Sequence, residues 1–300
     1  MKIIVAGGTG FIGSALVREL IRKGHEPVVL SRTLKKSEAQ GPRYLEWDGR
    51  SLGPWAEEIE TAEALINLSG EPVAAKRWSA PRKEAILQSR VLPTRVLVDA
   101  MSGAVRRPKV LINASAAGFY GDVPNGDIFE TSPKGNGFLA ETCDQWEKEA
   151  LRAEALGVRT VLLRIGIVIG KDGGALSKMV PPFRFFAGGP LGSGRQWVPW
   201  IHRQDLVNII LFALENGAIS GPVNAASPCP VTMRDLCGAL GEVLQRPSWL
   251  PVPSFVLRVM LGEMSGMLLG GQKAVPKALL DHHFVFQFPD VRAALREALH

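Results

Sequence analysis

Apolar residues in this chain gather in short runs, and several of the segments between them space their apolar positions as a helix does. The runs that predict strands are Lys2–Ala6, Pro27–Leu30, Arg43–Trp47, Ala64–Leu68, Lys109–Ala114 and Thr160–Gly170. Helices are predicted up to Arg22, over Pro81–Met101 with an interruption at Pro93, and over Leu139–Ala155. Strands that alternate with helices favour a mainly parallel sheet, so the pattern predicts an α/β fold.

The composition and the pattern of the sequence change from Gly173 onward. Proline and glycine become more frequent there, and shorter segments replace the regular alternation. We therefore expect residues 1–172 to form the main domain and residues 173–300 to form mainly a smaller α/β lobe, with parts of the later chain returning to the main domain. Such a lobe would close over the carboxyl ends of the strands, where open α/β sheets bind their ligands.

A glycine-rich turn follows the first predicted strand and opens the first predicted helix. Gly7 permits the sharp exit from the strand, Gly10 lets a pyrophosphate approach the backbone, and Gly13 lets the helix pack closely on the strand. The helix N-terminus offers unpaired N–H groups and a positive dipole end to an anion. This context predicts a Rossmann-type doubly wound sheet that binds a dinucleotide, the alternative being a tight turn without a ligand. The residues assigned to the dinucleotide here are Gly7, Thr9, Gly10, Phe11, Ile12 and Gly13.

The end of the second strand indicates which dinucleotide is held. An NAD site usually has Asp or Glu there to accept from the ribose 2′-hydroxyl, whereas this strand ends in Ser31 and Arg32, with Lys35 and Lys36 close behind. A hydroxyl and a planar guanidinium suit a 2′-phosphate. We therefore predict NADP as the cofactor, bound in part by Ser31 and Arg32; the alternative for Arg32 is a solvated loop cation.

The composition is that of a globular protein with a sizeable core. Hydrophobic residues make up 46% and charged residues 21%, and the formal charge is +6. No basic stripe is present, so nucleic acid is not expected as a partner. The longest apolar stretch near the C-terminus, Phe255–Leu269, is broken by Arg258, Gly262 and Glu263, so a membrane is not expected either. The three cysteines form no Cys-x-x-Cys pair, which favours reduced thiols in a cytoplasmic protein without a metal site.

Motifs spread over nearly the whole chain carry a family resemblance. In order they are Gly7–Gly13, Ser31-Arg32, Asn67–Gly70, Ser115–Gly121, Arg164–Gly170 and Ile201 to Leu206 with His202 and Asp205. This order resembles the extended short-chain dehydrogenase/reductase group of sugar-nucleotide epimerases. Longer stretches resemble an atypical branch, the epimerase family proteins of the short-chain dehydrogenase/reductase family 39U. These stretches are Ile66–Glu71, Arg77 to Arg90, Gly188–His202 and Gly271–Leu279.

The resemblance implies a catalytic Tyr-x-x-x-Lys pair that this chain does not have. Its only tyrosines are Tyr44 and Tyr120, and neither has Lys four residues on. The places of the pair align with Leu139 and Cys143, and neither side chain can do that work. What remains is Ser115, just past the fifth strand, which could hold a substrate oxygen. Tyr120 is an alternative proton donor; the competing roles are a loop hydrogen bond for Ser115 and packing for Tyr120.

Further contacts to the cofactor follow from the resemblance. Arg90 takes the place of an Asn on the helix after the fourth strand and is expected to face the ribose or pyrophosphate, unless it is a solvated helix residue. Asp48 is expected to accept from the adenine amino group, and Val168 to contact the nicotinamide end through its backbone. The loop of Leu68, Ser69 and Gly70 is expected to border the adenosine.

Two functions remain open on the sequence alone. The first is NADP-dependent hydride transfer to or from a small carbonyl, alcohol or nucleotide-sugar substrate, as an oxidoreductase or epimerase. The second is a redox sensor or regulatory protein that binds NADP(H) without chemistry, with a link to cell division implied by the labels of some relatives. A homodimer is left open.

Overall fold

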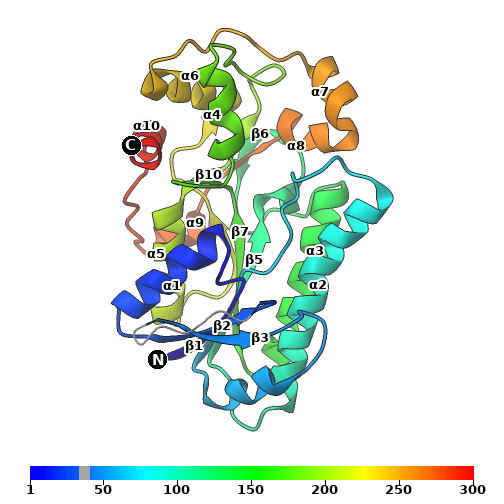
Figure 1. Cartoon of the computed structure of the whole chain (residues 1–300), viewed down its shortest axis with the longest axis vertical. Helices are drawn as coiled ribbons and strands as arrows, with labels where there is room; N and C mark the ends of the chain where they lie inside the picture. Colours follow the sequence, from blue (N-terminus) through cyan, green and yellow to red (C-terminus); the bar gives the residue numbers. More distant parts are fainter. Residues whose placement is uncertain (34–40) are drawn as a thin grey trace.

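The computed structural model describes residues 1–33 and 41–300, so Lys35 and Lys36 lie outside the described residues. Its centre is a seven-stranded sheet in the order β11-β7-β5-β4-β1-β2-β3 (Figure 1). Every neighbouring pair in it is parallel. The strands are β1 (Lys2–Ala6), β2 (Glu26–Ser31), β3 (Arg43–Glu46), β4 (Ala64–Asn67), β5 (Val110–Ala116), β7 (Arg159–Ile165) and β11 (Gly221–Ala225). The chain proceeds from β1 outward to β3, then returns to β4 on the other side of β1, so the strand order reverses between β1 and β4.

Helices cover both faces of this sheet, because alternate residues of each strand point to opposite faces. Ile3 and Val5 of β1 join a core with α1 (Phe11–Arg22) and α5 (Arg203–Glu215). Ile4 and Ala6 join the opposite core with α2 (Ala80–Gly103), and α3 (Phe138–Leu151) lies beside α2 on that face (Figure 1). The predicted doubly wound parallel sheet is thus confirmed.

Several boundaries differ from the predicted ones. Helix α2 runs through Pro93 without a break, because burial of apolar residues on both sides of the proline offsets its cost to the helix. Strand β5 extends to Ala116 instead of ending at Ala114, because β7 pairs with it that far. The run predicted as one strand over Thr160–Gly170 divides at Gly166 into β7 and β8 (Ile167–Ile169), and a Cβ on Gly166 would lie 2.6 Å from the Pro199 carbonyl oxygen.

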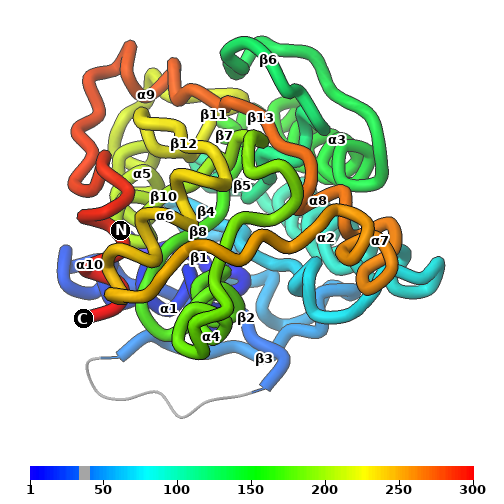
Figure 2. Tube along the Cα trace, turned by 90° about the horizontal axis from the view of Figure 1, so that it is seen from above, coloured from blue at the N-terminus to red at the C-terminus, as the bar shows by residue number. Residues whose placement is uncertain are grey.

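The remaining elements gather mainly at the carboxyl ends of the strands (Figures 1 and 2). The helices are α4 (Leu176–Arg184), α6 (Met233–Leu244), α7 (Ser254–Leu261), α8 (Gly266–Leu269), α9 (Lys277–Asp281) and α10 (Val291–Leu299). Two-stranded pairs join β8 to β10 (Trp200–His202), β9 (Trp197–Val198) to β12 (Val231–Thr232), and β6 (Val123–Ile128) to β13 (Gln272–Ala274). Short 3-10 helices span Pro54–Thr61, Ala117–Tyr120, Glu154–Leu156 and Gly262–Ser265. A separate apolar core joins α4, α6 and α10, whereas α5 and β11 return to the central layer.

None of the helices in the described ranges is long and apolar enough to cross a lipid bilayer.

Candidate functional site

The glycine turn lies where the strand order reverses. Its three glycines differ in the space that surrounds them. Gly7 has φ +78°, and a Cβ on it would lie 2.6 Å from the Leu68 carbonyl oxygen. A Cβ on Gly13 would lie 2.2 Å from the Gly7 carbonyl oxygen, so α1 can approach the turn only without a side chain there. A Cβ on Gly10 would meet only that same oxygen, at 3.3 Å. Gly10 is therefore open on the side from which a ligand would approach.

The N-terminus of α1 has the properties of an anion site. No side chain caps it at Gly10, and Thr9 and Gly10 are exposed. Phe11 and Ile12 are half-buried. The first N–H groups of a helix have no intrahelical partner, so this end offers donors and a positive dipole end together. This geometry fits the phosphates of a dinucleotide.

The loop after β4 lies directly beside the glycine turn. The Leu68 N–H donates to the Ala6 carbonyl at 2.9 Å. The Ser69 N–H donates to the Asn67 side-chain oxygen at 3.1 Å. Asn67 is itself fully buried and donates to Thr94 and Asn113. The predicted border of Leu68, Ser69 and Gly70 is therefore next to the predicted phosphate site, held by a buried amide network.

Arg90 on α2 contacts the backbone of the loop that follows β4. One of its Nη groups donates to the Glu71 carbonyl at 2.9 Å, and the other donates to the Ile86 carbonyl at 3.0 Å. The guanidinium lies 5.3 Å from the centre of the Trp146 ring, and a Cβ on Gly70 would come within 3.1 Å of it. Burial lowers the pKa of Arg90. These contacts give Arg90 a positioning role on the backbone of the loop; its predicted contact with the cofactor stays a prediction.

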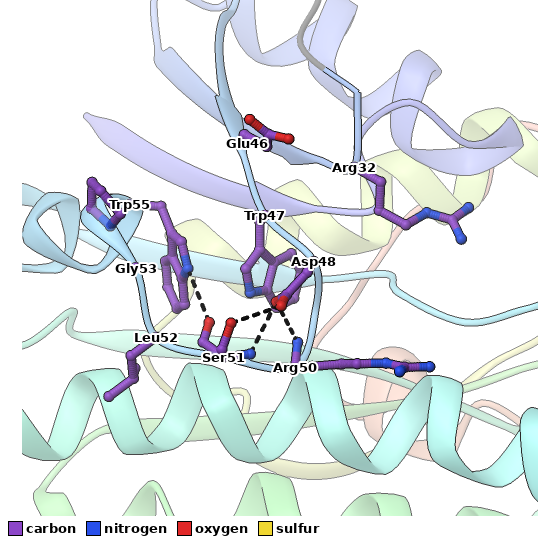
Figure 3. A pocket seen from close by; sticks show the side chains of 10 residues that line it. Arg32, Glu46, Trp47, Asp48, Arg50, Ser51, Leu52, Gly53 and Trp55 are labelled. Atoms are coloured by element: carbon purple, nitrogen blue, oxygen red, sulfur yellow. Dashed lines mark hydrogen bonds between the residues drawn. The ribbon is translucent and has the colours of Figure 1, made fainter.

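The residues predicted for the adenosine side meet at the ends of β2 and β3. Arg32 and Asp48 line one hollow of about 630 Å³, which Figure 3 shows from close by. The Asp48 carboxylate accepts from the N–H groups of Arg50 and Ser51 and from the Ser51 hydroxyl, and these bonds lower its pKa to about 2. The Ser31 hydroxyl donates to the Thr33 carbonyl and so fixes the turn that carries Arg32.

Val168 and Phe11 lie on the other side of the turn. Val168 is in β8 and pairs with Ile201 of β10. The Phe11 ring fits against Gly170, Gly173 and Gly174, where added Cβ atoms would come within 2.6–3.2 Å of it. The start of α1 is thus packed under the segment after β8. This brings Val168 to the same edge of the sheet as the glycine turn, whereas its contact with a nicotinamide stays a prediction.

Ser115 and Tyr120 both belong to a buried polar network. Ser115 is 3% exposed and its hydroxyl donates to the Glu147 carboxylate at 2.6 Å. Arg164 donates to both oxygens of Glu147, at 3.0 and 2.9 Å, and to the Tyr120 hydroxyl at 2.9 Å. Tyr120 in turn donates to the Asn224 side-chain oxygen at 2.7 Å. The network joins β5, α3, β7 and β11 below the carboxyl edge of the sheet.

The position of the two hydroxyls bears on their predicted chemistry. Ser115 lies inside β5, not just past it, and both of these side chains are almost fully buried. Burial raises the pKa of Tyr120 to about 12, in spite of the nearby Arg164. A phenol with that pKa is a weak acid at neutral pH. In this arrangement the two residues make the contacts of structural groups; their catalytic roles stay predictions.

The positions that align with the missing catalytic pair lie beside the end of β5. Leu139 packs against Gly118, where an added Cβ would be 3.3 Å from the Leu139 Cβ. One turn further along α3, the Cys143 thiol lies 3.8 Å from the Ala116 carbonyl oxygen. Burial raises the pKa of Cys143 to about 11. Leu139 therefore has no proton to exchange, and the Cys143 thiol is a very weak acid near neutral pH.

Glu147, Arg164 and Asn224 are the site-adjacent residues that the sequence reasoning missed. Glu147 follows Cys143 by one helical turn, on the same stripe of α3. Arg164 interrupts the apolar run of β7 and is only 4% exposed. A charged residue inside a buried strand signals an ionic partner. The sequence alone therefore indicated that Arg164 needs an ionic partner, but it did not identify Glu147 as that partner. His202 caps α5, and the Asp205 carboxylate accepts from the N–H groups of Gln287 and Phe288.

A parallel sheet with a glycine turn at its order reversal and further helices over the carboxyl ends of its strands defines a Rossmann-type protein of the extended dehydrogenase/epimerase fold. The model of the NAD dependent epimerase/dehydratase family matches residues 3–226. The chain belongs to this family. A second model, a domain of unknown function (DUF1731), matches residues 252–298.

Individual relatives agree over full length. The chain is 44% identical to an Arabidopsis thaliana protein named "Epimerase family protein SDR39U1 homolog, chloroplastic", covering 99% of this chain and 86% of that one. It is 39% identical to Bacillus subtilis epimerase family protein YfhF, covering 100% and 98%. A crystal structure of human epimerase family protein SDR39U1 (isoform 2) with NADPH superposes with a TM-score of 0.88 at 33% identity and covers 99% of both chains. The resemblance inferred from the motifs is thus confirmed.

Proposed function

We propose that this protein binds NADP(H) at the glycine turn. The observation that carries the proposal is the unequal space around the three glycines: Gly7 and Gly13 have no room for a Cβ, while Gly10 is open above an uncapped helix N-terminus. Such a cradle lets the backbone approach a pyrophosphate closely. The human relative crystallised with NADPH supports the same ligand.

The preference for NADP over NAD rests on Arg32. It follows β2 directly, it is exposed, and it lines the hollow next to Asp48. More distant proteins of this fold were crystallised with NAD, so the fold alone does not decide between the cofactors. Titrations with NADPH and NADH test the assignment. Arg32→Ala should weaken NADPH far more than NADH, and equal losses would contradict the 2′-phosphate role.

Hydride transfer is the chemistry that we propose for the bound cofactor. When bound, NADPH would supply a hydride to a small carbonyl substrate, and NADP⁺ would accept one from an alcohol or nucleotide-sugar substrate, at the carboxyl edge of the sheet. For this step the predicted roles are Ser115 holding a substrate oxygen and Tyr120 or water handling the proton. A panel of carbonyl compounds with NADPH tests the reaction. If the double variant Ser115→Ala, Tyr120→Phe stays folded and fully active, the assigned roles are wrong.

A second candidate is a redox sensor that binds NADP(H) without turnover. The specific observation in its favour is that Leu139 and Cys143 replace the acid–base pair while the hydroxyls of Ser115 and Tyr120 are held in a buried network. Tight NADPH binding without turnover on any compound of the panel would favour the sensor. Failure to bind either nucleotide would contradict both functions.

A further inference from the structure

The turn after β3 presents a second arginine at the hollow that Arg32 lines. Gly49 adopts φ +72°, and the Asp48 carboxylate accepts from the backbone N–H groups of Arg50 at 2.7 Å and Ser51 at 2.9 Å. The same carboxylate accepts from the Ser51 hydroxyl. These bonds fix the backbone at Arg50, because an Asp that bonds two residues ahead closes a tight turn. The direction in which Arg50 leaves the chain is therefore set by the turn.

Arg50 and Arg32 line the same hollow from neighbouring strands. In the parallel pair of β2 and β3, Ser31 stands opposite Glu46, so Arg32 leaves the sheet level with the first residue after β3. Figure 3 shows the two arginine side chains extending toward the same side of the hollow, with Asp48 between their backbones. Parallel strands are about 4.8 Å apart, which is less than the reach of an arginine side chain.

Both guanidinium groups are available to a ligand. Within residues 1–33 and 41–300, neither forms an ion pair, and neither donates a side-chain hydrogen bond. Each offers up to five N–H donors in a planar fork. The Asp48 carboxylate already accepts hydrogen bonds from the turn. Glu46 is the other carboxylate that lines the hollow, and it accepts no hydrogen bond from the turn. Planar forks without internal partners suit an oxyanion with several acceptor oxygens.

We infer that Arg50 is a specificity-determining residue which, with Arg32, holds the 2′-phosphate of NADP(H). The inference rests on the proposed binding of NADP(H) at the glycine turn and adds a second donor to its adenosine end. The 2′-phosphate is a monoester with a charge near −2 at neutral pH and three acceptor oxygens. Two forks can share those oxygens, whereas the 2′-hydroxyl of NAD offers none of that charge.

The test compares Arg50→Ala with Arg32→Ala and with Arg106→Ala, each titrated with NADPH and NADH by nicotinamide fluorescence. Arg106 is an exposed arginine before the amino end of β5, so it is the matched control for loss of one positive charge. Arg50→Ala should raise the Kd for NADPH about tenfold, equivalent to about 1.4 kcal/mol, and leave the Kd for NADH within about twofold. Adenosine 2′,5′-bisphosphate, which lacks the nicotinamide half, should lose affinity by the same factor.

Two results would overturn the inference while leaving the proposed function intact. In the first, Arg50→Ala binds NADPH like the wild type and the Arg106→Ala control, while Arg32→Ala loses its preference. In the second, Arg50→Ala loses the same factor for NADPH and NADH, which would make Arg50 a contact to another part of the nucleotide. If the wild-type protein binds neither dinucleotide, the proposed function and this inference both fail.

Discussion

Replacement of Arg164 by Met tests the buried hydrogen-bond network that contains the hydroxyls of Ser115 and Tyr120, the two predicted catalytic residues. Arg164 is 4% exposed and donates to Glu147 through two nitrogens, to the Tyr120 hydroxyl, and to the Glu130 carbonyl. Its guanidinium also lies 3.6 Å from the centre of the Phe119 ring. Met fills similar space without the charge. Within the described residues, Glu147 would then keep one hydrogen-bond donor, Ser115.

The expected loss of stability is large, because one partner of a buried pair is removed. Breaking such a pair costs about 3–5 kcal/mol, mostly because the remaining charge is left buried and unpaired. That is a large part of a typical unfolding free energy of about 5–15 kcal/mol. At about 2 °C for each kcal/mol in a chain of this size, the thermal midpoint should fall by about 6–10 °C.

Calorimetric and urea unfolding measure this loss, and the chain offers a matched control. Arg95→Met removes an arginine whose side chain is 47% exposed and whose partner is Glu149. An exposed pair contributes at most about 1 kcal/mol, so this control should move the midpoint little. The double variant Glu147→Leu, Arg164→Met removes both charges of the pair, so it should be more stable than Arg164→Met alone. If Arg164→Met lies within about 1 kcal/mol of the wild type, the pair does not support the fold as argued.

Three further predictions follow from single residues. Gly10→Ala should keep the stability of the wild type but weaken NADPH at least tenfold, whereas Gly13→Ala should lower the thermal midpoint as well, because its Cβ would overlap the Gly7 carbonyl; equal stability of the two variants would be evidence against the turn geometry. In an alkaline absorbance titration, the ionisation near pH 12 should be absent from Tyr120→Phe, and because the folded pKa is raised above about 10, stability should fall as pH rises from about 10 to 12. At pH 8 a thiol reagent should modify exposed Cys229 and spare Cys143, whose pKa is raised to about 11; rapid modification of Cys143 in the folded protein would contradict its burial.

Local chemistry made the first part of the fold predictable. The strand Lys2–Ala6 and the helix after it coincide with β1 and α1 because the glycine turn fixes where one ends and the other begins. The end of β5 was not predictable in this way. Ser115 and Ala116 continue the strand because they pair with residues of β7, more than forty positions later in the chain. The local pattern of apolar and polar residues cannot indicate a strand partner at that separation in the chain.

The candidate site likewise has a part that local sequence predicts and a part that depends on distant partners. The phosphate cradle depends on neighbours in sequence and was predicted from them. Arg32 and Asp48 were assigned to the cofactor separately, and only the structure shows that they line one hollow. The network of Ser115 depends on Glu147 and Asn224, which come from elements far apart in the chain. Sequence spacing could suggest that a charge inside β7 needs a partner, but only the packing of α3 on β5 shows which residue provides it.

The absence of the Tyr-x-x-x-Lys pair acquires a physical meaning from this packing. Leu139 and Cys143 occupy one stripe of α3 that ends in Glu147, and this stripe packs on the end of β5. A lysine in place of Cys143 would place an ammonium group in a buried position, where desolvation disfavours the charge and where Glu147 and Arg90 act on it with opposite sign. The proposed pyrophosphate cradle lies at Gly10 and the start of α1, and none of these residues belongs to it. Loss of the acid–base pair is therefore compatible with an intact cofactor site. Any proton transfer must use a group other than Leu139 and Cys143, or a water molecule.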